Sequence, residues 1–583
     1  MGHRIRRESD NLFAIPKGAN ITKTNAVYIN SSNYRVEPKD GRKAYTSHKK
    51  LCIGVACLNA DGTPTDKMYG NDSYYRLFQV EMLPEPPERA DSISVGPRVM
   101  TETIASDYLL IEFLTEVFGE SDAALILDLA TYMLTEEKAV FQHFPAWGRR
   151  HELYSSSVRS DSYISKFIGG SLTYSKIDQF REKWAHNNIG NGHVYYCYDS
   201  TNTNSQADGT FIVQKGHAKD DPTLMQVNTD YVVRQEDGLP LTFMEFPGSI
   251  VDIAEASEMI EQLNRVSNGA DVDITLICDR GYISEENVDL LDGAGIGFLL
   301  MLKSNMGVHG EILEKYASKV KNNYSCYLKE HDEFGMTIER PLFSSERSRW
   351  FHLLWNQTLE GKHRNRLLKA IENKRKELEK AVERKTTYSE EDLRRIAKWF
   401  TLCVEESGAI TVKKKGRGKN KETVKAFNIV GFKENNQIIS KELERCGFYL
   451  LVSSRKMDVT EARNAYSKRD CVEKVFQALK SSLGMDEIGV ASDNSIQGKS
   501  LIWFVASILH SILFTCTSGL RLKDKKTFTI PAIMDKIDAV VADKNIQTGS
   551  YTRRYKLDKK QNEIFKACGI SVERVDEIIR AME

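Results

Sequence analysis

The chain has 583 residues, of which 41% are hydrophobic and 28% charged, and this composition is typical of a soluble globular protein with roughly two to four domains. Lys plus Arg and Asp plus Glu number 81 each, so the whole-chain charge gives no indication of a nucleic-acid partner. The ten cysteines include no CxxC pair and no Cys/His grouping with zinc spacing, which argues against a disulfide scaffold and favours free thiols. No basic stretch followed by an apolar run opens the chain, so we expect an intracellular protein.

The N-terminal third is predicted to hold two regions of different character. Residues 1–100 contain short β-like runs broken by turn sequences and end in the proline-rich LPEPPE at 83–88, which predicts a small β-rich module followed by a linker. From 101 to 189 the apolar residues recur at helical spacing, which predicts a helical domain.

Strand and helix patterns alternate over residues 190–303. HVYYCYD at 193–199 and DITLICD at 273–279 are apolar strands that each end on an aspartate. The intervening elements are a hairpin over 231–246 turned at Asp237-Gly238 and a helix over 254–267, and a helix opening at Ser284 and a strand over 297–303 follow. This order predicts a mixed α/β sheet covered on both faces, with both aspartates at the carboxyl ends of strands.

The composition changes again over residues 304–445, which are predicted to form an insertion domain. A highly charged helix is expected over 363–385, and the basic run KKKGRGKNK at 413–421 lies between two expected strands. The α/β pattern resumes over 446–520 with a strand at 447–454 and a long helix over about 458–483. LIWFVASILHSILFTC at 501–516 is shorter than the roughly 20 residues of a membrane span, so we expect a buried core helix and no membrane partner. Residues 521–583 are predicted to form a helical C-terminal tail, with helices over DKIDAVVADK and VERVDEIIRAM.

The segment YSKRDCVEKVFQALK at 466–480 carries an unusual set of polar residues. At about 100° per residue, Tyr466, Arg469, Glu473 and Lys480 share one stripe of a helix, beside an apolar face. Alone, this pattern is more typical of an amphipathic helix with a solvated charged face. Together with Asp199 and Asp279, however, Glu473 completes a set of three carboxylates. Such oxygen ligands suit magnesium or manganese, and two ions roughly 3.5 to 4 Å apart promote phosphodiester chemistry.

The spacing of these residues resembles a known family. Tyr466, Arg469, Glu473 and Lys480 match the Y-(2)-R-(3)-E-(6)-K signature of bacterial insertion-sequence DDE transposases, and YDSTNTNS with Asp199 and CDRGY with Asp279 resemble the two aspartate motifs of that group. The resemblance implies a ribonuclease-H-like α/β core that an insertion domain interrupts. It also implies that Asp199, Asp279 and Glu473 are catalytic and hold two magnesium or manganese ions.

The same resemblance implies cut-and-paste transposition, in some members through a hairpin intermediate, in which the freed 3′ hydroxyl attacks target DNA. The implied partners are double-stranded DNA, as transposon terminal repeats and as target, and a second copy of the chain in the active complex. The implied compartment is a prokaryotic cytoplasm, at the nucleoid. Tyr466, Arg469 and Lys480 would hold DNA near the terminal phosphate, and the helical domain over 101–189 is a candidate for binding the repeats.

Several residues and functions remain open to more than one interpretation. Arg280 could meet a phosphate or pair with a neighbouring acid, and Trp350 and Trp355 could stack on a flipped base, although core packing is favoured for both. For the basic runs at 413–421, 521–526 and 552–560, a solvated loop is favoured over a DNA contact. The alternative functions are a ribonuclease-H-fold nuclease, a catalytically silent domesticated DNA-binding protein, and a chance arrangement in an unrelated α/β protein.

Overall fold

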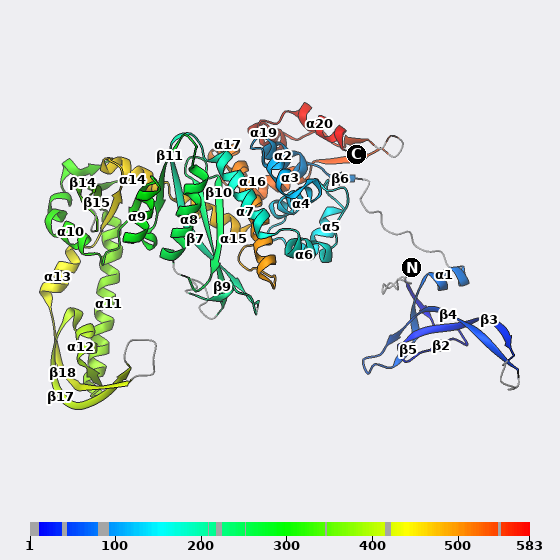
Figure 1. Ribbon diagram of the computed structural model, residues 1–583, viewed down its shortest axis with the longest axis horizontal. Helices are drawn as coiled ribbons and strands as arrows, with labels where there is room; N and C mark the ends of the chain where they lie inside the picture. The colour runs from blue at the N-terminus through cyan, green and yellow to red at the C-terminus, as the bar shows by residue number, and fades with distance from the viewer. Residues whose placement is uncertain are drawn as a thin grey trace. The chain divides into compact units, whose positions relative to one another are not determined.

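The computed structural model describes residues 11–37, 44–79, 92–207, 209–216, 224–250, 252–343, 347–413, 421–545, 548 and 550–582. Its contacts divide the chain into two units, Met1–Pro87 and Glu88–Glu583 (Figure 1). The proline-rich run at 83–88 and all but the two end residues of the basic run at 413–421 lie outside the described residues.

The N-terminal unit is an antiparallel sheet with one helix. The strand order is β1-β5-β4-β3-β2, and a small core of Val27, Ile53, Ala56, Met68 and Tyr74 joins the sheet to the helix. Asn71 caps this helix by accepting from two backbone N–H groups. Strands therefore make up most of the described residues of this unit. The elements are β1 (Leu12–Ala14), β2 (Asn20–Ile21), β3 (Ala26–Val36), β4 (Tyr45–Leu58), β5 (Pro64–Gly70) and α1 (Asp72–Phe78).

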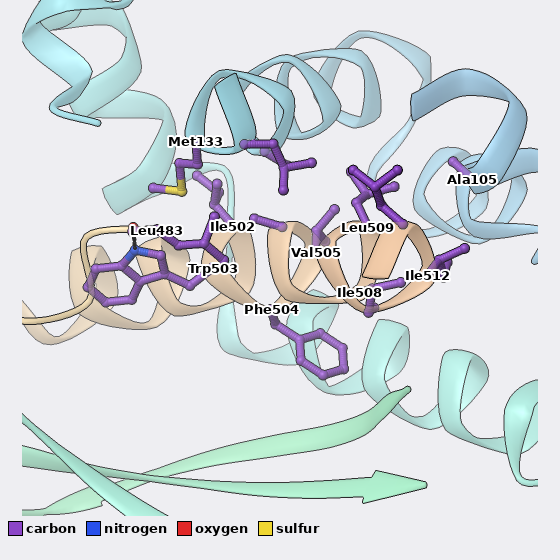
Figure 2. Packing of buried hydrophobic residues seen from close by; sticks show 14 of the residues in the cluster. Ala105, Met133, Leu483, Ile502, Trp503, Phe504, Val505, Ile508, Leu509 and Ile512 are labelled. Atoms are coloured by element: carbon purple, nitrogen blue, oxygen red, sulfur yellow. Dashed lines mark hydrogen bonds between the residues drawn. The ribbon is translucent and has the colours of Figure 1, made fainter. Parts of the chain in front are cut away.

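The helices that follow pack around one buried helix, α16 (Asp493–Cys516). Figure 2 shows its apolar side chains pointing outward in several directions, with Leu509 directed toward neighbouring helices and Phe504 toward the side on which the strands lie. Among the described residues it is the one helix long and apolar enough to cross a membrane, but 78% of its most apolar stretch is buried inside the protein. The predicted core helix is therefore present. The helices of this segment that contact α16 are α2 (Gly96–Ser106), α4 (Glu120–Thr135), α6 (Asp161–Gly170) and α7 (Tyr174–Asn188). The helices α3 (Leu110–Phe118), η2 (Phe141–His143) and α5 (Phe144–Gly148) pack against these four helices.

A ten-stranded sheet forms the centre of the larger unit, with the order β10-β9-β7-β11-β12-β19-β15-β14-β13 and β8 paired to β9. In its first part, β7 is antiparallel to β9 and parallel to β11, which is parallel to β12. With β8 set aside, the strands stand in the spatial order third, second, first, fourth, fifth, which is the ribonuclease-H-like arrangement expected. These strands are β7 (Gly192–Ser205), β8 (Gln214–Lys215), β9 (Met225–Arg234), β10 (Pro240–Pro247), β11 (Val272–Cys278) and β12 (Gly297–Met301).

Helices cover both faces of this sheet, as the sequence predicts. One face packs on α8 (Asp252–Ser267), α9 (Glu285–Gly293) and α10 (Gly307–Val320). The other packs on α7, α15 (Asp470–Ser481) and α16, in the same continuous core that contains α2 to α6. The helical segment over 101–189 therefore shares one hydrophobic core with this face of the sheet.

The segment expected as an insertion domain, 304–445, divides between the central sheet and a separate three-stranded sheet. Its first part adds strands to the central sheet, where β15 pairs with both β14 and β19. The chain then leaves the sheet after Trp355 and returns at Phe448, which is the cross-strand partner of Trp355. The sheet strands are β13 (Tyr327–Leu328), β14 (Glu333–Pro341), β15 (Ser348–Trp355) and β19 (Phe448–Ser453), with η4 (Tyr324–Cys326) before them.

Between β15 and β19 the chain forms a long helix and a three-stranded sheet, which we call the excursion (residues 356–447; Figure 1). Its own small core includes Leu378, Trp399 and Phe400. Helix α11 is the charged helix expected from the sequence, although it begins earlier than predicted. The elements are α11 (Gln357–Glu383), β16 (Thr387–Ser389), α12 (Glu390–Ile396), η5 (Ala397–Trp399), β17 (Phe400–Lys413), β18 (Lys421–Glu434) and α13 (Asn436–Glu444).

The C-terminal tail is not wholly helical. The helix expected over 535–544 ends at Asp538, and the next residues form β20, which pairs with β6 and β21. Asp538 accepts from His151 at 2.7 Å and from Ser94 at 2.9 Å, so its side chain joins the helix end to the segment that precedes α2. The elements are β6 (Ser92–Ser94), α17 (Ser518–Lys523), α18 (Ile530–Asp538), β20 (Val541–Lys544), β21 (Tyr551–Arg553), α19 (Lys559–Ala567) and α20 (Val572–Ala581).

The contact between α16 and α6 can be tested at Gly498. A Cβ at this position would lie 2.3 Å from the backbone oxygen of Ile168, so Gly498→Ala must push the two helices apart. We expect a loss of about 1 to 3 kcal/mol in unfolding free energy, measured by chemical denaturation. Gly519→Ala in α17 is the control, because nothing lies within 4 Å of its Cβ and alanine favours helix. Equal stability of the two variants would contradict this packing.

Candidate active site

Two aspartates lie side by side on neighbouring parallel strands. Tyr198 of β7 pairs with Cys278 of β11, so the next residues, Asp199 and Asp279, stand at the same level on chains about 4.8 Å apart. Tyr198 and Cys278 are buried under α8 and α9. Since side chains alternate along a strand, both aspartates point to the opposite face, which α15 covers.

Both strands are expected to end on their aspartate, and only β11 stops there: its last residue is Cys278, directly before Asp279. The Asp279 carboxylate accepts a hydrogen bond from the backbone N–H of Arg280 at 2.7 Å and so caps the short helix η3 (Arg280–Tyr282). β7 continues to Ser205, because β9 offers it antiparallel partners as far as Met225. Asp199 therefore lies within a strand, at the point where its parallel neighbour stops.

The long helix expected over 458–483 is interrupted in the middle of the signature. Helix α14 (Val459–Ser467) carries Tyr466, and α15 begins at Asp470 and carries Glu473. In between, the backbone N–H groups of Arg469, Cys471 and Val472 bond to carbonyls three residues earlier instead of four. Ser467 Oγ also donates to the Asn464 carbonyl at 2.7 Å, which competes with a helical continuation. The single-helix prediction is wrong here, and the break places Arg469 at a corner.

From this corner Arg469 reaches two of the three carboxylates. Its Nη1 donates to Asp199 Oδ2 at 2.9 Å, and its Nη2 donates to Glu473 Oε1 at 2.6 Å. The Arg469 side chain is 15% exposed, compared with 57% for Glu473. A guanidinium suits this position because its fork of N–H groups can serve two acceptors at once.

Tyr466 lies next to the third carboxylate. Its hydroxyl is 3.5 Å from Asp279 Oδ1, a long hydrogen bond in which the phenol donates. Burial, and then the charge of Asp279, raise the pKa of Tyr466 above its ordinary value, so the phenol stays protonated. The structure thus joins Asp199, Asp279 and Glu473 through Arg469 and Tyr466 at one edge of the sheet.

The donor chemistry of this edge fits a hard divalent cation. Asp199, Asp279 and Glu473 offer carboxylate oxygens, which Mg²⁺ and Mn²⁺ prefer. Within the described ranges, no three His, Cys, Asp or Glu side chains are grouped closely enough to hold one ion, and the guanidinium of Arg469 stands between Asp199 and Glu473. The residue types therefore fit the implied metals, and the roles of the three carboxylates as metal ligands remain predictions.

The other residues singled out in the sequence lie at different distances from this centre. Lys480 is half-buried in the last turn of α15, and Arg280 is exposed on η3 beside Asp279. Trp355 packs in the core against Phe334, with ring centroids 5.7 Å apart, as favoured for it. Trp350 is half-buried on β15 between Glu339 and Ser453.

A buried network holds α14 in place. Glu333 of β14 accepts two hydrogen bonds from Arg463 of α14, at 3.0 and 3.1 Å. It also accepts from the Tyr449 hydroxyl at 2.5 Å and from Asn356 Nδ2 at 3.1 Å. The Glu333 side chain is only 5% exposed, so this ion pair is well shielded from solvent. These contacts fix the helix that carries Tyr466 to the extended part of the sheet.

A cavity of about 1090 Å³ opens beside Asp279 and Tyr466 and extends to α11, where Lys362 and Arg366 line it. Neither residue belongs to a motif that is recognisable in the sequence. A signal was present, because α11 contains no acidic residue between Glu360 and Glu372 although the rest of the helix mixes both charges. Only the fold shows that this acid-free part faces the site.

The chain has matches among known sequence families and among solved structures. Residues 196–509 match the model of the family described as "Transposase DDE domain". Among solved structures, the chain is similar to piggyBac transposase in a cryo-EM structure of its synaptic complex with hairpin DNA. That similarity has 9% sequence identity and a TM-score of 0.37, and covers 76% of this chain and 79% of the other. No curated protein sequence matches significantly. Because the family match spans more than half of the chain and includes Asp199, Asp279 and Glu473, this protein belongs to the DDE transposase domain family.

Proposed function

We propose that this protein is a cut-and-paste DNA transposase, which cleaves the ends of a mobile element and joins their 3′ hydroxyls to target DNA. The observation that carries the proposal is the meeting of Asp199, Asp279 and Glu473 through Arg469 and Tyr466. Three carboxylates at one sheet edge, beside cationic side chains, suit the cleavage and transfer of phosphodiester bonds. Membership of the DDE transposase domain family supports the same conclusion.

Asp199, Asp279 and Glu473 would hold magnesium or manganese, two ions in each active site. When bound, such ions activate the attacking oxygen and stabilise the leaving oxygen of an in-line displacement. The protein contributes the placement of the ligands. The parallel pairing of β7 and β11 fixes the two aspartates, and the corner between α14 and α15 brings Glu473 opposite them.

Arg469 acts in this proposal as a positioning residue, since its two hydrogen bonds set the separation of Asp199 and Glu473. Tyr466 keeps a proton at its hydroxyl, which donates to Asp279 here and could turn to donate to a phosphate oxygen in its place when DNA is bound. Lys480, in the last turn of α15, and Arg280, next to Asp279, carry positive charge and would contact the DNA backbone.

The partners follow from the reaction. The substrates are double-stranded DNA at the two ends of the element and at the target. Because both ends must reach neighbouring target positions, we propose a homodimer in the active complex, in a prokaryotic cytoplasm where the nucleoid supplies the target. A hairpin at the cleaved end is proposed as the intermediate.

The proposal is tested by mapping the products of the purified protein on a plasmid that carries its gene with flanking DNA. With magnesium, we expect nicks at two fixed positions outside the gene, followed by double-strand ends and joined products in a second plasmid. Denaturing gels separate hairpin from open ends. Cleavage without joining would instead make the protein a nuclease, and binding without cleavage would make it a DNA-binding protein.

Glu473→Gln is expected to abolish nicking, because the amide removes one anionic ligand while keeping the size of the side chain. DNA binding should change less than about 3-fold, since few phosphate contacts depend on this carboxylate. The control is Asp470→Asn on the same helix, whose carboxylate pairs with Lys474 at 2.8 Å. It should nick at the wild-type rate. Normal nicking by Glu473→Gln in magnesium would remove Glu473 from the catalytic set.

Arg469→Lys tests the positioning role. Lysine keeps the charge but cannot bridge Asp199 and Glu473 with two directed hydrogen bonds. We expect the nicking rate at saturating magnesium to fall by at least about 10-fold, because small displacements of reacting groups are costly. DNA affinity should stay within about 3-fold of wild type. Lys468→Ala, at an exposed neighbouring position, is the control. If Arg469→Lys weakens DNA binding and leaves the rate in saturating DNA unchanged, Arg469 serves only to bind DNA.

A further inference from the structure

One face of α11, from Lys362 to Asn373, carries a row of long polar side chains: Lys362, Asn365, Arg366, Lys369 and Asn373, which we call the α11 stripe. Steps of three and four residues place them on one side of the helix. All five are exposed. At about 1.5 Å per residue, the stripe is about 16 Å long.

The α11 stripe has positive charge that the described part of the chain does not neutralise. No described carboxylate forms an ion pair with Lys362, Arg366 or Lys369, and these three cations lie in the acid-free part of the helix, between Glu360 and Glu372. Glu360, just before it, pairs instead with Lys321 at 2.6 Å.

The second half of the same helix differs. Lys374 pairs with Glu377, Arg375 with Glu379 and Lys376 with Glu372, at 2.5 to 3.9 Å. The two halves of α11 therefore carry similar numbers of cations but different net charge. Pairing within the second half is what a solvated helix is expected to show, and its absence in the first half needs another explanation.

The α11 stripe is continuous with the active site. The cavity beside Asp279 and Tyr466 reaches Lys362 and Arg366, and a second hollow of about 650 Å³ continues along the stripe to Asn373. His363, on the wall of the first cavity, has a pKa lowered by partial burial and then by the charges of Arg366 and Arg280. Positive side chains from η3 and from α11 thus approach the same point.

Other cations of the cavity wall are already paired. Lys398 lies 3.4 Å from Glu442, and Arg463 is bonded to Glu333. The unneutralised charge of the wall comes from Arg280, Lys362, Arg366 and Arg445, and it leads away from Asp279 along α11. A ligand that matches this track is an extended polyanion that passes through the active site.

We propose that the α11 stripe binds the phosphate backbone of a DNA duplex that passes Asp279, so that the excursion holds DNA next to the reacting phosphate. At about 3.4 Å of helix axis per phosphate along one strand, the stripe spans about five phosphates. The inference rests on the proposed function, because it names where the DNA of that reaction lies beyond the catalytic residues.

Two variants with equal loss of charge test the proposal. One replaces Lys362, Arg366 and Lys369 with Ala, and the matched control replaces Lys374, Arg375 and Lys376 with Ala. The probe is a fluorescent duplex of about 40 base pairs of arbitrary sequence, bound to the full chain over a range of salt concentrations. Thermal denaturation of each variant checks that the substitutions leave the fold intact.

For the stripe variant we expect the slope of log K against log salt to become shallower by about 2.7, or 0.9 for each lost contact. Its affinity near 0.1 M salt should fall on the order of 100-fold, while the control should stay within about 3-fold of wild type. Equal losses of duplex affinity in both variants would show a general effect of net charge. No loss of affinity in the stripe variant would show that the stripe does not bind DNA. Either result overturns the proposal. If a triple variant is unstable, Arg366→Gln against Arg375→Gln gives the same comparison with one contact.

The outcome is separable from that of the proposed function. If the wild-type protein makes no cuts in the plasmid assay and the stripe variant still loses duplex binding, the transposase proposal fails and DNA binding by the stripe stands. If the wild type cuts and joins DNA while both triple variants bind the duplex equally, the transposase proposal stands and the stripe proposal fails.

Discussion

The candidate site depends on the parallel pairing of two strands. Because Tyr198 and Cys278 are cross-strand partners, the residues that follow them stand at the same height and on the same face. A shift of one residue in either strand would turn one aspartate under α8 and α9, where an unpaired carboxylate is costly. The apolar residues that fill both faces of the sheet therefore fix the position of the acids as well as the fold.

The contacts that position Glu473 and Tyr466 come from distant parts of the chain. Glu473 lies on a helix that packs beside α16 in the larger core, and Tyr466 lies on a helix tied to β14 through Arg463 and Glu333. These two supports meet at Arg469, where the helix is broken. A continuous helix would have kept all four signature residues in one row, whereas the corner lets the guanidinium face both Asp199 and Glu473.

The sequence predicted the parts of the fold that depend on local pattern. The apolar strands and the buried helix α16 can be predicted because burial dictates their composition, and the two aspartates stand out because each directly follows an apolar run. The break at Arg469 cannot be predicted in this way, because Ser467 and the carboxylates that stabilise it act through contacts that helical periodicity does not contain. For the same reason the sequence pattern predicts helix where β20 forms, because its partner β6 precedes it by more than four hundred residues. Lys362 and Arg366 become site residues only because α11 starts beside the sheet.

The way the excursion joins the sheet has a consequence for how such a protein can change. Its two ends are neighbours in space, since the Asn356 N–H donates to the Gly447 carbonyl at 3.1 Å and Trp355 faces Phe448. In the topology of the sheet, the excursion therefore occupies the position of the loop that connects two antiparallel neighbouring strands, β15 and β19. Loop-closure entropy rises by only about 0.6 kcal/mol for each doubling of the length of a flexible loop, so the length of the chain inserted between two paired strands has little effect on their pairing. The strands that hold the acids can thus keep their geometry while the excursion is exchanged for another of different length, so the carboxylate site and the excursion are free to evolve at separate rates.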